Sequence, residues 1–385
     1  MGIIKNKTAI VILAYADFES LEISLACHSR FLDSNSKIFI LQNGRGTYDC
    51  ERTYNVAKRY EILYPNNIEV VDDIPPQRPY YAIKQLLDSD RLKDYDYICK
   101  LDDDVFPITD NWFAKLCDTY DKQYAVLGDK LGYVTSLVNN NPWGTKRVMD
   151  LMGLYDEYLK KYSRDHYVGF ELDDKYVPLK FVRRGDYNDG GAGTVWKLAY
   201  VARWIHENTT LMPEKYIDAT RGRGTVEVNN QERYSINCMV FEKSFWNKID
   251  IGSPDDEHQT LVYCKDNNKK IIADLEVPMV HLFFYPQRNE NKDMIVPIRD
   301  YYQKWLNLVF PISICPDKTI ENENRMRFLE TGLTNVVHHM ESSKFNKFSN
   351  NAKYLKYKIL SKITFGKVRR RYKEKKNRYM LKLGK

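Results

Sequence analysis

The sequence predicts an α/β fold in which a central, mostly parallel sheet is covered by helices on both faces. Short apolar runs alternate with amphipathic stretches over the first quarter of the chain. The runs are continuously apolar, as expected of strands that are buried on both faces. With 43% hydrophobic and 13% aromatic residues among 385, the chain can build one large domain or two smaller ones, which excludes a wholly disordered protein.

The opening part of the chain predicts four strands separated by three helices. The strands are expected at residues 8–15, 37–41, 68–71 and 95–101, and the helices at residues 18–31, 49–64 and 80–92. Asn43 and Gly44 stop the second strand, and Pro79 suits the first position of the third helix because it has no N–H to satisfy. Strands and helices that alternate in this rhythm form a parallel sheet.

The remainder of the chain is less regular but continues the α/β pattern. Helices are expected at residues 148–162, 194–207, 256–265, 300–308 and 321–342. Strands are expected at residues 238–241 and 270–273, followed by a further apolar run at residues 277–285. No internal repeat interrupts this order, so the sequence predicts one α/β body with a helical extension at its C-terminal end.

The charge of the chain is divided between an acidic body and a basic tail. Residues 344–385 hold 16 of the 59 basic residues and one of the 52 acidic residues, so the tail carries +15 and the body −8. Leu355, Ile359 and Ile363 fall at helical spacing among lysines, and residues 367–376 form a polybasic cluster. A basic amphipathic helix of this kind is typical of segments that bind anionic membranes.

Two alternatives to membrane binding by the tail stay open, a solvated helix and a helix that binds a protein partner. Nucleic acid is not expected as a partner, because the body is acidic and shows no nucleic-acid-binding motif. Seven cysteines without regular spacing argue against a disulfide framework, and no apolar run approaches the roughly 20 residues of a membrane-spanning helix. No signal-peptide pattern stands at the beginning of the sequence. We expect a cytoplasmic protein that associates peripherally with the inner face of the cell membrane.

The strongest chemical signal is the acid triplet Asp102, Asp103 and Asp104, which ends the strand expected at residues 95–101. Ligands of open α/β sheets bind at the carboxyl ends of the strands. Three neighbouring carboxylates repel one another, and a divalent cation removes that repulsion. Oxygen ligands suit Mg²⁺ or Mn²⁺, which commonly bridge carboxylates to substrate phosphates. A solvated acidic turn is the alternative, and the apolar strand before the triplet disfavours it.

Two further groups of residues are candidates, each with a purely structural alternative. Asp256 and Glu257 open the helix expected at residues 256–265, where the helix dipole favours carboxylates, so they are either an N-terminal cap or a reactive pair. His281 lies in the apolar run at residues 277–285, where a lone histidine is more often a core residue than a ligand.

The acid triplet after a buried strand resembles the DxD signature of GT-A glycosyltransferases, as found in family 2 enzymes. The strand–helix opening at residues 10–15 and the run at residues 38–44 support the resemblance, which covers roughly residues 8–290. It implies a Rossmann-like GT-A sandwich and a nucleotide-sugar donor. It also implies a GT-A domain at residues 1–290, a helical extension at residues 291–343 and the tail at residues 344–385. Within the domain, the donor-binding part ends at about residue 135.

The resemblance also implies roles for individual residues. Asp256 or Glu257 would deprotonate the acceptor hydroxyl as the catalytic base. The implied metal ligands, for Mn²⁺ or Mg²⁺, are Asp102, Asp104 and His281, and the imidazole favours Mn²⁺. The implied donor-binding residues are Ala14, Tyr15, Asp17, Asn43, Arg78, Lys84, Asp102, Asp103 and Arg288. One departure concerns the base of the nucleotide, because Gln42 and Asn43 stand where such enzymes often have an acid.

Together these observations predict a metal-dependent, inverting glycosyltransferase that moves a sugar from a nucleotide sugar, expected to be a UDP-sugar, to a hydroxyl of a glycan or lipid-linked acceptor. A composition rich in Lys, Asn and Tyr indicates an AT-rich bacterial genome, and surface glycan synthesis is the expected setting. A sugar nucleotidyltransferase is the alternative enzyme, but it would need a glycine-rich basic loop after the first strand, which residues 14–18 do not form. A non-enzymatic module that binds membranes or nucleic acid through the tail would leave both acid groups unexplained.

Overall fold

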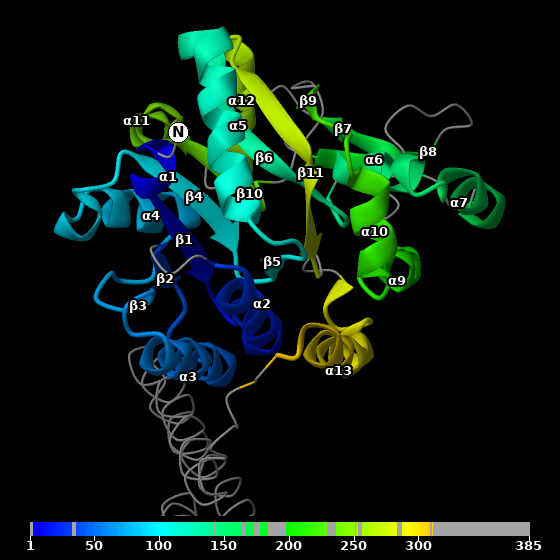
Figure 1. Ribbon diagram of the computed structural model, residues 1–385, viewed down its shortest axis with the longest axis horizontal. Coiled ribbons are helices and arrows are strands. Elements are labelled where there is room, and N and C mark those ends of the chain that lie inside the picture. Colours follow the sequence, from blue (N-terminus) through cyan, green and yellow to red (C-terminus); the bar gives the residue numbers. More distant parts are fainter. Residues whose placement is uncertain are drawn as a thin grey trace, which may run out of the picture. The chain divides into compact units, whose positions relative to one another are not determined.

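The computed structural model describes residues 3–32, 36–141, 143–162, 167–172, 178–183, 198–228, 236–250, 252, 256–282, 287–308 and 310. Apart from residues 46–48, all of these belong to one compact unit that spans residues 1–45 and 49–310. The unit is built on a central sheet with helices on both of its faces (Figure 1). The basic tail and the helix expected at residues 321–342 lie outside the described residues.

The central sheet has nine strands, and six of them run in the same direction. They are β1 (Thr8–Ala14), β2 (Ile38–Gln42), β3 (Ile68–Val71), β4 (Tyr97–Asp102), β5 (Val105–Pro107), β6 (Leu131–Val138), β9 (Thr225–Val228), β10 (Cys238–Glu242) and β11 (Lys270–His281). Their order is β3-β2-β1-β4-β10-β6-β11-β5, with β9 beside β11. Only β5, β9 and β10 run against the others. The predicted α/β class with a mostly parallel central sheet is therefore confirmed.

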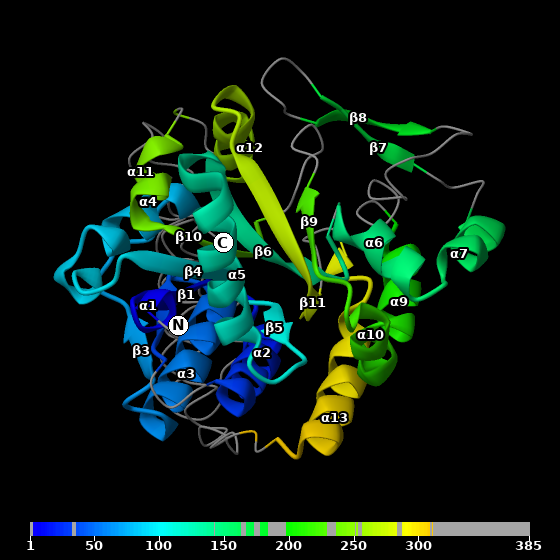
Figure 2. The ribbon, with the colours of Figure 1, turned by 45° about the horizontal axis from the view of Figure 1, so that its top comes forward.

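The helices of the described chain fall on either side of this sheet and beside it. They are α1 (Ile3–Asn6), α2 (Phe18–Phe31), α3 (Tyr48–Leu63), α4 (Pro79–Leu87), α5 (Trp112–Leu127), α6 (Gly144–Leu151), α7 (Tyr155–Tyr162), α9 (Ala199–Asn208), α10 (Pro213–Thr220), α11 (Lys243–Lys248), α12 (Asp256–Asp266) and α13 (Ile295–Leu306). A two-stranded antiparallel sheet of β7 (Tyr167–Leu172) and β8 (Pro178–Arg183) stands apart from the central one (Figure 2). In the part of the chain that the structure describes, no helix combines the length and apolar character needed to cross a bilayer.

Ring contacts define which helices cover which face of the central sheet. On one face Tyr120 of α5 packs edge-on against Tyr97 of β4, with ring centroids 5.4 Å apart. On the other face Trp246 of α11 stacks on both Phe241 of β10 and Tyr80 of α4. Successive side chains of a strand point to opposite faces of the sheet. Lys100 stands three positions after Tyr97 in β4, so its side chain points to the other face, which α4 and α11 cover.

The structure differs from the expected elements at several places beyond β4. The strand β6 and the short strand β5 were not expected, because glycine, threonine and serine interrupt the apolar run of β6 although all eight of its residues are buried. The helix expected at residues 148–162 is two helices, which separate at Gly153 with its φ of +69°. Residues 270–273 and residues 277–281 of the next apolar run belong to one long strand, β11, whose pairing with β6 shifts between Asp274 and Pro278. A proline at such an irregularity costs the sheet no ladder hydrogen bond.

Candidate active site

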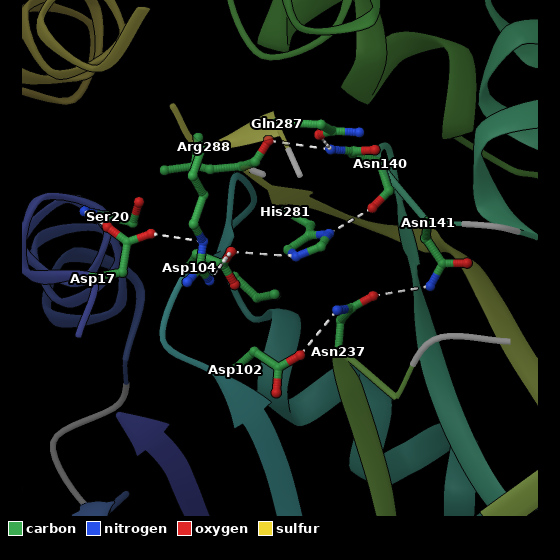
Figure 3. A network of polar contacts seen from close by, with 12 residues as sticks. Asp17, Ser20, Asp102, Asp104, Asn140, Asn141, Asn237, His281, Gln287 and Arg288 are labelled. Atoms are coloured by element: carbon green, nitrogen blue, oxygen red, sulfur yellow. Dashed lines mark hydrogen bonds and ion pairs between the residues drawn. The ribbon is translucent and has the colours of Figure 1, made fainter. Parts of the chain in front are cut away.

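The acid triplet lies at the carboxyl end of β4, where Asp102 and Asp104 point into two different environments (Figure 3). Asp103 and Asp104 are almost completely buried, whereas 30% of the Asp102 side chain is exposed. The neighbours of Asp104 are His281 at the end of β11, Arg288 beyond it and Asp17 just before α2. Those of Asp102 are Lys100 of β4 and Asn237, which precedes β10. The site therefore divides into two charged clusters.

The first is the Asp104 cluster, which consists of Asp17, Asp103, Asp104, His281 and Arg288. Oδ2 of Asp104 lies 3.3 Å from Nε2 of His281 and 3.5 Å from a guanidinium nitrogen of Arg288. Nε of the same arginine lies 3.3 Å from Oδ2 of Asp17, which caps α2 by accepting from the backbone N–H of Ser20. Asp103 accepts a 3.0 Å hydrogen bond from the backbone N–H of Tyr15. Residues distant in sequence thus meet around Asp104, as predicted for a strand-end site.

The ionisation of the Asp104 cluster is shaped by burial and by its two cations. Burial alone would raise the pKa of Asp104, but His281 and Arg288 outweigh burial and lower that pKa to about 2. Burial likewise opposes the charged imidazole, and the carboxylate of Asp104 reverses this and raises the pKa of His281. For Asp103, burial and the charge of Asp104 dominate, and its pKa is raised. The cluster is held together by contacts between opposite charges.

The second is the Lys100 cluster, which consists of Lys100, Asp102 and Asn237. Nζ of Lys100 donates to Oδ1 of Asp102 at 2.5 Å, and the side-chain amide of Asn237 donates to Oδ2 at 2.9 Å. The backbone N–H of Asp102 also donates to the carbonyl oxygen of Asn237 at 3.1 Å. Asp102 is therefore bonded to different partners from Asp104, although the two residues stand two positions apart.

The acidic pair Asp256 and Glu257 occupies the first turn of α12, half-buried, and its charges act on Lys100. Burial would lower the pKa of Lys100, but Asp102, Asp256 and Glu257 together outweigh burial and raise it. The two candidates for the catalytic base, Asp256 and Glu257, thus lie close enough to the Lys100 cluster to interact with it electrostatically.

A run of three buried asparagines, Asn139 to Asn141, connects the two clusters. The carbonyl oxygen of Asn140 accepts from Nδ1 of His281 at 2.5 Å. The next residue, Asn141, donates from its side chain to Oδ1 of Asn237 at 3.1 Å. The sequence analysis missed these asparagines, and it missed Lys100 and Asn237 as well. A polar triplet directly after an apolar run was the available signal, the same signal that identified Asp102 to Asp104.

The remaining predicted donor-binding residues lie at varying distances from these clusters. Ala14 is buried at the end of β1, and Tyr15 beside it is 56% exposed. The side-chain amide of Asn43 exchanges two hydrogen bonds with the backbone of Gln77. Arg78 is exposed at the start of α4, and Lys84 bonds to Asp88 and to Asn247 of α11. The contacts of Asn43 and Lys84 hold neighbouring elements together and do not join either cluster.

Asp104 and His281 fit a divalent cation. Because a carbonyl oxygen only accepts, the contact with Asn140 places a proton on Nδ1 of His281 and leaves Nε2 as the nitrogen that faces Asp104. Metal-binding histidines are commonly oriented in this way. Among the described residues, no three His, Cys, Asp or Glu side chains gather into a complete cage. A cation here would therefore take its other ligands from phosphate oxygens and water, as Mg²⁺ often does.

Comparison with known proteins found similar solved structures at low sequence identity. No protein-family model and no curated protein matches the sequence. Among solved structures, the chain is similar to GalNAc-T7 with UDP, GalNAc and Mn²⁺, at 10% identity and a TM-score of 0.40 over 82% of this chain and 58% of that one. It is also similar to the 4-diphosphocytidyl-2C-methyl-D-erythritol synthase of Anaerococcus prevotii, at 14% identity and a TM-score of 0.39 over 77% and 98%.

A third similar structure is the bifunctional glycosyltransferase WbbM, at 13% identity and a TM-score of 0.30 over 64% of this chain and 34% of that one. The chain thus spans a little over half the length of the GalNAc-T7 chain and about a third of WbbM. What this protein does is therefore argued from its own site.

Proposed function

We propose that this protein is a metal-dependent glycosyltransferase of the GT-A type, which moves a sugar from a nucleotide-sugar donor to a hydroxyl group. The observation that carries the proposal is the Asp104 cluster, in which a buried carboxylate and a buried imidazole from the ends of β4 and β11 approach within 3.3 Å. Two positions before Asp104 stands a more exposed carboxylate, Asp102, and the charges of the acidic pair of α12 act on Lys100, the partner of Asp102. Transfer from a diphosphate donor to a hydroxyl needs a site for the diphosphate next to a proton acceptor.

The Asp104 cluster supports the donor half of this reaction. A cation held by Asp104 and His281 would neutralise the charge that develops on the departing nucleoside diphosphate. The guanidinium of Arg288 is planar and suited to bidentate contact with phosphate oxygens. Asp102, with 30% of its side chain exposed, is open to accept hydrogen bonds from the ribose hydroxyls. We expect a UDP-sugar to be the donor.

The acidic pair of α12 supports the acceptor half. Either Asp256 or Glu257 takes the proton of the acceptor hydroxyl while the hydroxyl oxygen bonds to the anomeric carbon and the bond to the diphosphate breaks. A general base contributes about 10²–10⁴-fold to such a step. Because a single displacement approaches the anomeric carbon from the face opposite the leaving group, the product has inverted configuration.

A donor screen tests the proposed function. The full-length protein is incubated with UDP-, GDP- and CDP-sugars and Mn²⁺, and release of nucleoside diphosphate is measured. We expect release from one class of donor, lost with EDTA and restored by added Mn²⁺. Full activity in EDTA would contradict the metal assignment. Formation of pyrophosphate from a nucleoside triphosphate and a sugar phosphate would instead identify a nucleotidyltransferase.

The acceptor is proposed to be a glycan or a lipid-linked glycan in bacterial surface glycan synthesis, reached at the inner face of the cell membrane. The support is the charge of the tail, since each basic residue near an anionic surface contributes about 1 kcal/mol. Deletion of residues 344–385 should abolish sedimentation with anionic vesicles while donor hydrolysis continues. Unchanged sedimentation of the deletion variant would contradict membrane docking, and a preference of the intact protein for duplex DNA would favour a nucleic-acid partner.

A further inference from the structure

Lys100 is a charged residue in the interior of a central strand, a place where the fold does not need a charge. It lies in β4 between Val11 of β1 and Met239 of β10, and 1% of its surface is exposed. Burying an ammonium without partners is costly. An apolar residue of similar volume often replaces a buried ion pair without loss of stability. The presence of Lys100 therefore calls for an explanation beyond folding.

The hydrogen bonds of Lys100 act on one residue of the candidate site. Nζ donates to Oδ1 of Asp102 at 2.5 Å and to the carbonyl oxygen of Ile236 at 3.0 Å. With Asn237 bonded to Oδ2, both oxygens of Asp102 have a donor of fixed position. The carboxylate cannot rotate without breaking one of these bonds, so its orientation is set by Lys100 and Asn237 together.

Charge adds a second reason for an ammonium at this position. Asp102, Asp256 and Glu257 all act on Lys100 as attractive negative charges. Without a cation among them, these carboxylates would repel one another, because like charges in a partly buried site are weakly screened. The repulsion would move Asp102 away from the acidic pair of α12.

We propose that Lys100 is a positioning residue, whose buried ammonium holds the carboxylate of Asp102 in the orientation that the donor requires and next to the acidic pair of α12. The inference rests on the proposed function, because it assigns Lys100 a part in the same transfer reaction. Lys100 acts through Asp102 and does not itself contact the donor. The Asp104 cluster has its own cations, His281 and Arg288, so metal and diphosphate binding should not depend on Lys100.

The first test replaces the ammonium with an uncharged side chain of similar length. Lys100→Met should lower kcat for donor turnover about 10–100-fold, the usual cost of removing a residue that orients a ligand. Binding of Mn²⁺ alone should be unchanged, because the Asp104 cluster is untouched. Binding of UDP with Mn²⁺ should weaken, because Asp102 is proposed to accept hydrogen bonds from the ribose hydroxyls. The matched control is Lys243→Met, which removes a half-buried ammonium near the start of β4, at the opposite edge of the sheet. This control should keep the wild-type kcat.

The second test separates positioning through Asp102 from a general structural effect. Asp102→Asn and the double variant Lys100→Met/Asp102→Asn should have the same kcat within about threefold, because Lys100 has no carboxylate left to position. The double variant removes the charges of both partners of the ion pair and is expected to fold even where Lys100→Met alone does not.

The outcomes are distinguishable. A folded Lys100→Met with wild-type kcat would overturn the role of Lys100, and so would a double variant that is a further 10–100-fold slower than Asp102→Asn. Either result leaves the proposed function intact, provided that the wild-type protein turns over a donor. A wild-type protein that turns over none refutes the function and the role of Lys100 together.

Discussion

Lys100 and Arg288 each balance carboxylates of the same acid triplet, but the two cations are held in different ways. The Lys100 side chain is 2% exposed and comes from the middle of a central strand, with a 2.5 Å contact to Asp102. The Arg288 side chain is 34% exposed, and its contacts with Asp17 and Asp104 are 3.3 and 3.5 Å long. Its buried Nε, which lies 3.3 Å from Oδ2 of Asp17, makes no hydrogen bond of good geometry to any residue that the structure describes.

This difference indicates that one cation is a fixed part of the fold and the other is exchangeable. Lys100 cannot leave Asp102 without leaving a buried charge unpaired, which is strongly unfavourable. Arg288 has solvent on one side and long contacts, and we propose that it turns from the acids to an anionic ligand when another cation takes its place on Asp104. The Asp104 cluster is therefore the half of the site that is suited to a metal and a diphosphate.

The largest effect on kcat is expected from substitutions in the acidic pair, Asp256 and Glu257, whose charges act on Lys100. Asp256→Asn and Glu257→Gln remove a proton acceptor with little change in shape, and one of them should lower kcat by about 10²–10⁴-fold. The affinity for UDP with Mn²⁺ should stay close to that of the wild type, because the Asp104 cluster is untouched. Steady-state kinetics and calorimetry of the two variants measure this. If both variants keep the wild-type turnover, Asp256 and Glu257 only cap α12 and neither is the catalytic base.

A substitution of Asp104 is expected to have a smaller effect, which lowers both kcat/KM and the affinity for UDP with Mn²⁺. Asp104→Asn should lower kcat/KM for the donor by roughly 10²–10³-fold, as removal of one stabilising group of a transition state does. It should also weaken the binding of UDP with Mn²⁺. The matched control is Asp274→Asn, which removes a buried carboxylate of β11 that accepts from Thr119 on α5 at 2.6 Å. If both variants lose activity equally, the loss comes from the fold and not from the Asp104 cluster.

The smallest effect is expected on the free energy of unfolding and concerns the buried imidazole of His28. His28 packs against Trp112, and Nε2 lies 3.1 Å from the carbonyl oxygen of Val105. Burial lowers its pKa to about 4, in contrast to His281. Between the unfolded pKa of 6.5 and pH 4, the unfolded chain binds a proton that the folded protein does not, so stability falls as the pH falls through this window.

His28→Gln keeps a donor for the Val105 carbonyl and removes the titration. The loss of unfolding free energy between pH 7.5 and pH 4.5 should be smaller in the variant by about 2–3 kcal/mol. Urea unfolding at both pH values measures it. An equal loss in variant and wild type would show that His28 is protonated in the folded state.

The parts of this site that the sequence predicted share one property, a local pattern that needs no partner to be recognised. Asp102 to Asp104 follow an apolar run, and Asp256 opens a helix that the structure contains at Asp256–Asp266. Lys100 gave no such signal, because a single lysine in an apolar run looks like an interruption. The role of Lys100 depends on its interactions with Asp102, Asn237 and the acidic pair of α12, and only the folded chain brings Asn237 and α12 near it.

The same reasoning explains the errors in the fold. The run at residues 270–285 reads as two strands because Asp274 and Glu276 interrupt its apolar character, yet Asp274 is satisfied by Thr119 and β11 continues past it. Likewise β6 is recognisable as a strand only after β10 and β11 flank it. The local sequence pattern was sufficient to predict a strand where the segment is apolar throughout. It was insufficient where the polar residues of a strand find their hydrogen-bond partners in other elements.

We propose that Asp104 and His281 accept a divalent cation together with a nucleoside diphosphate, and that Arg288 then turns to the diphosphate. Calorimetric titration of UDP into the protein of residues 1–385, with Mn²⁺ and with EDTA, is the decisive measurement. We expect UDP to bind in the presence of Mn²⁺, EDTA to abolish the binding, and His281→Ala to lose it as well. Equal binding of UDP with Mn²⁺ and with EDTA would contradict the claim.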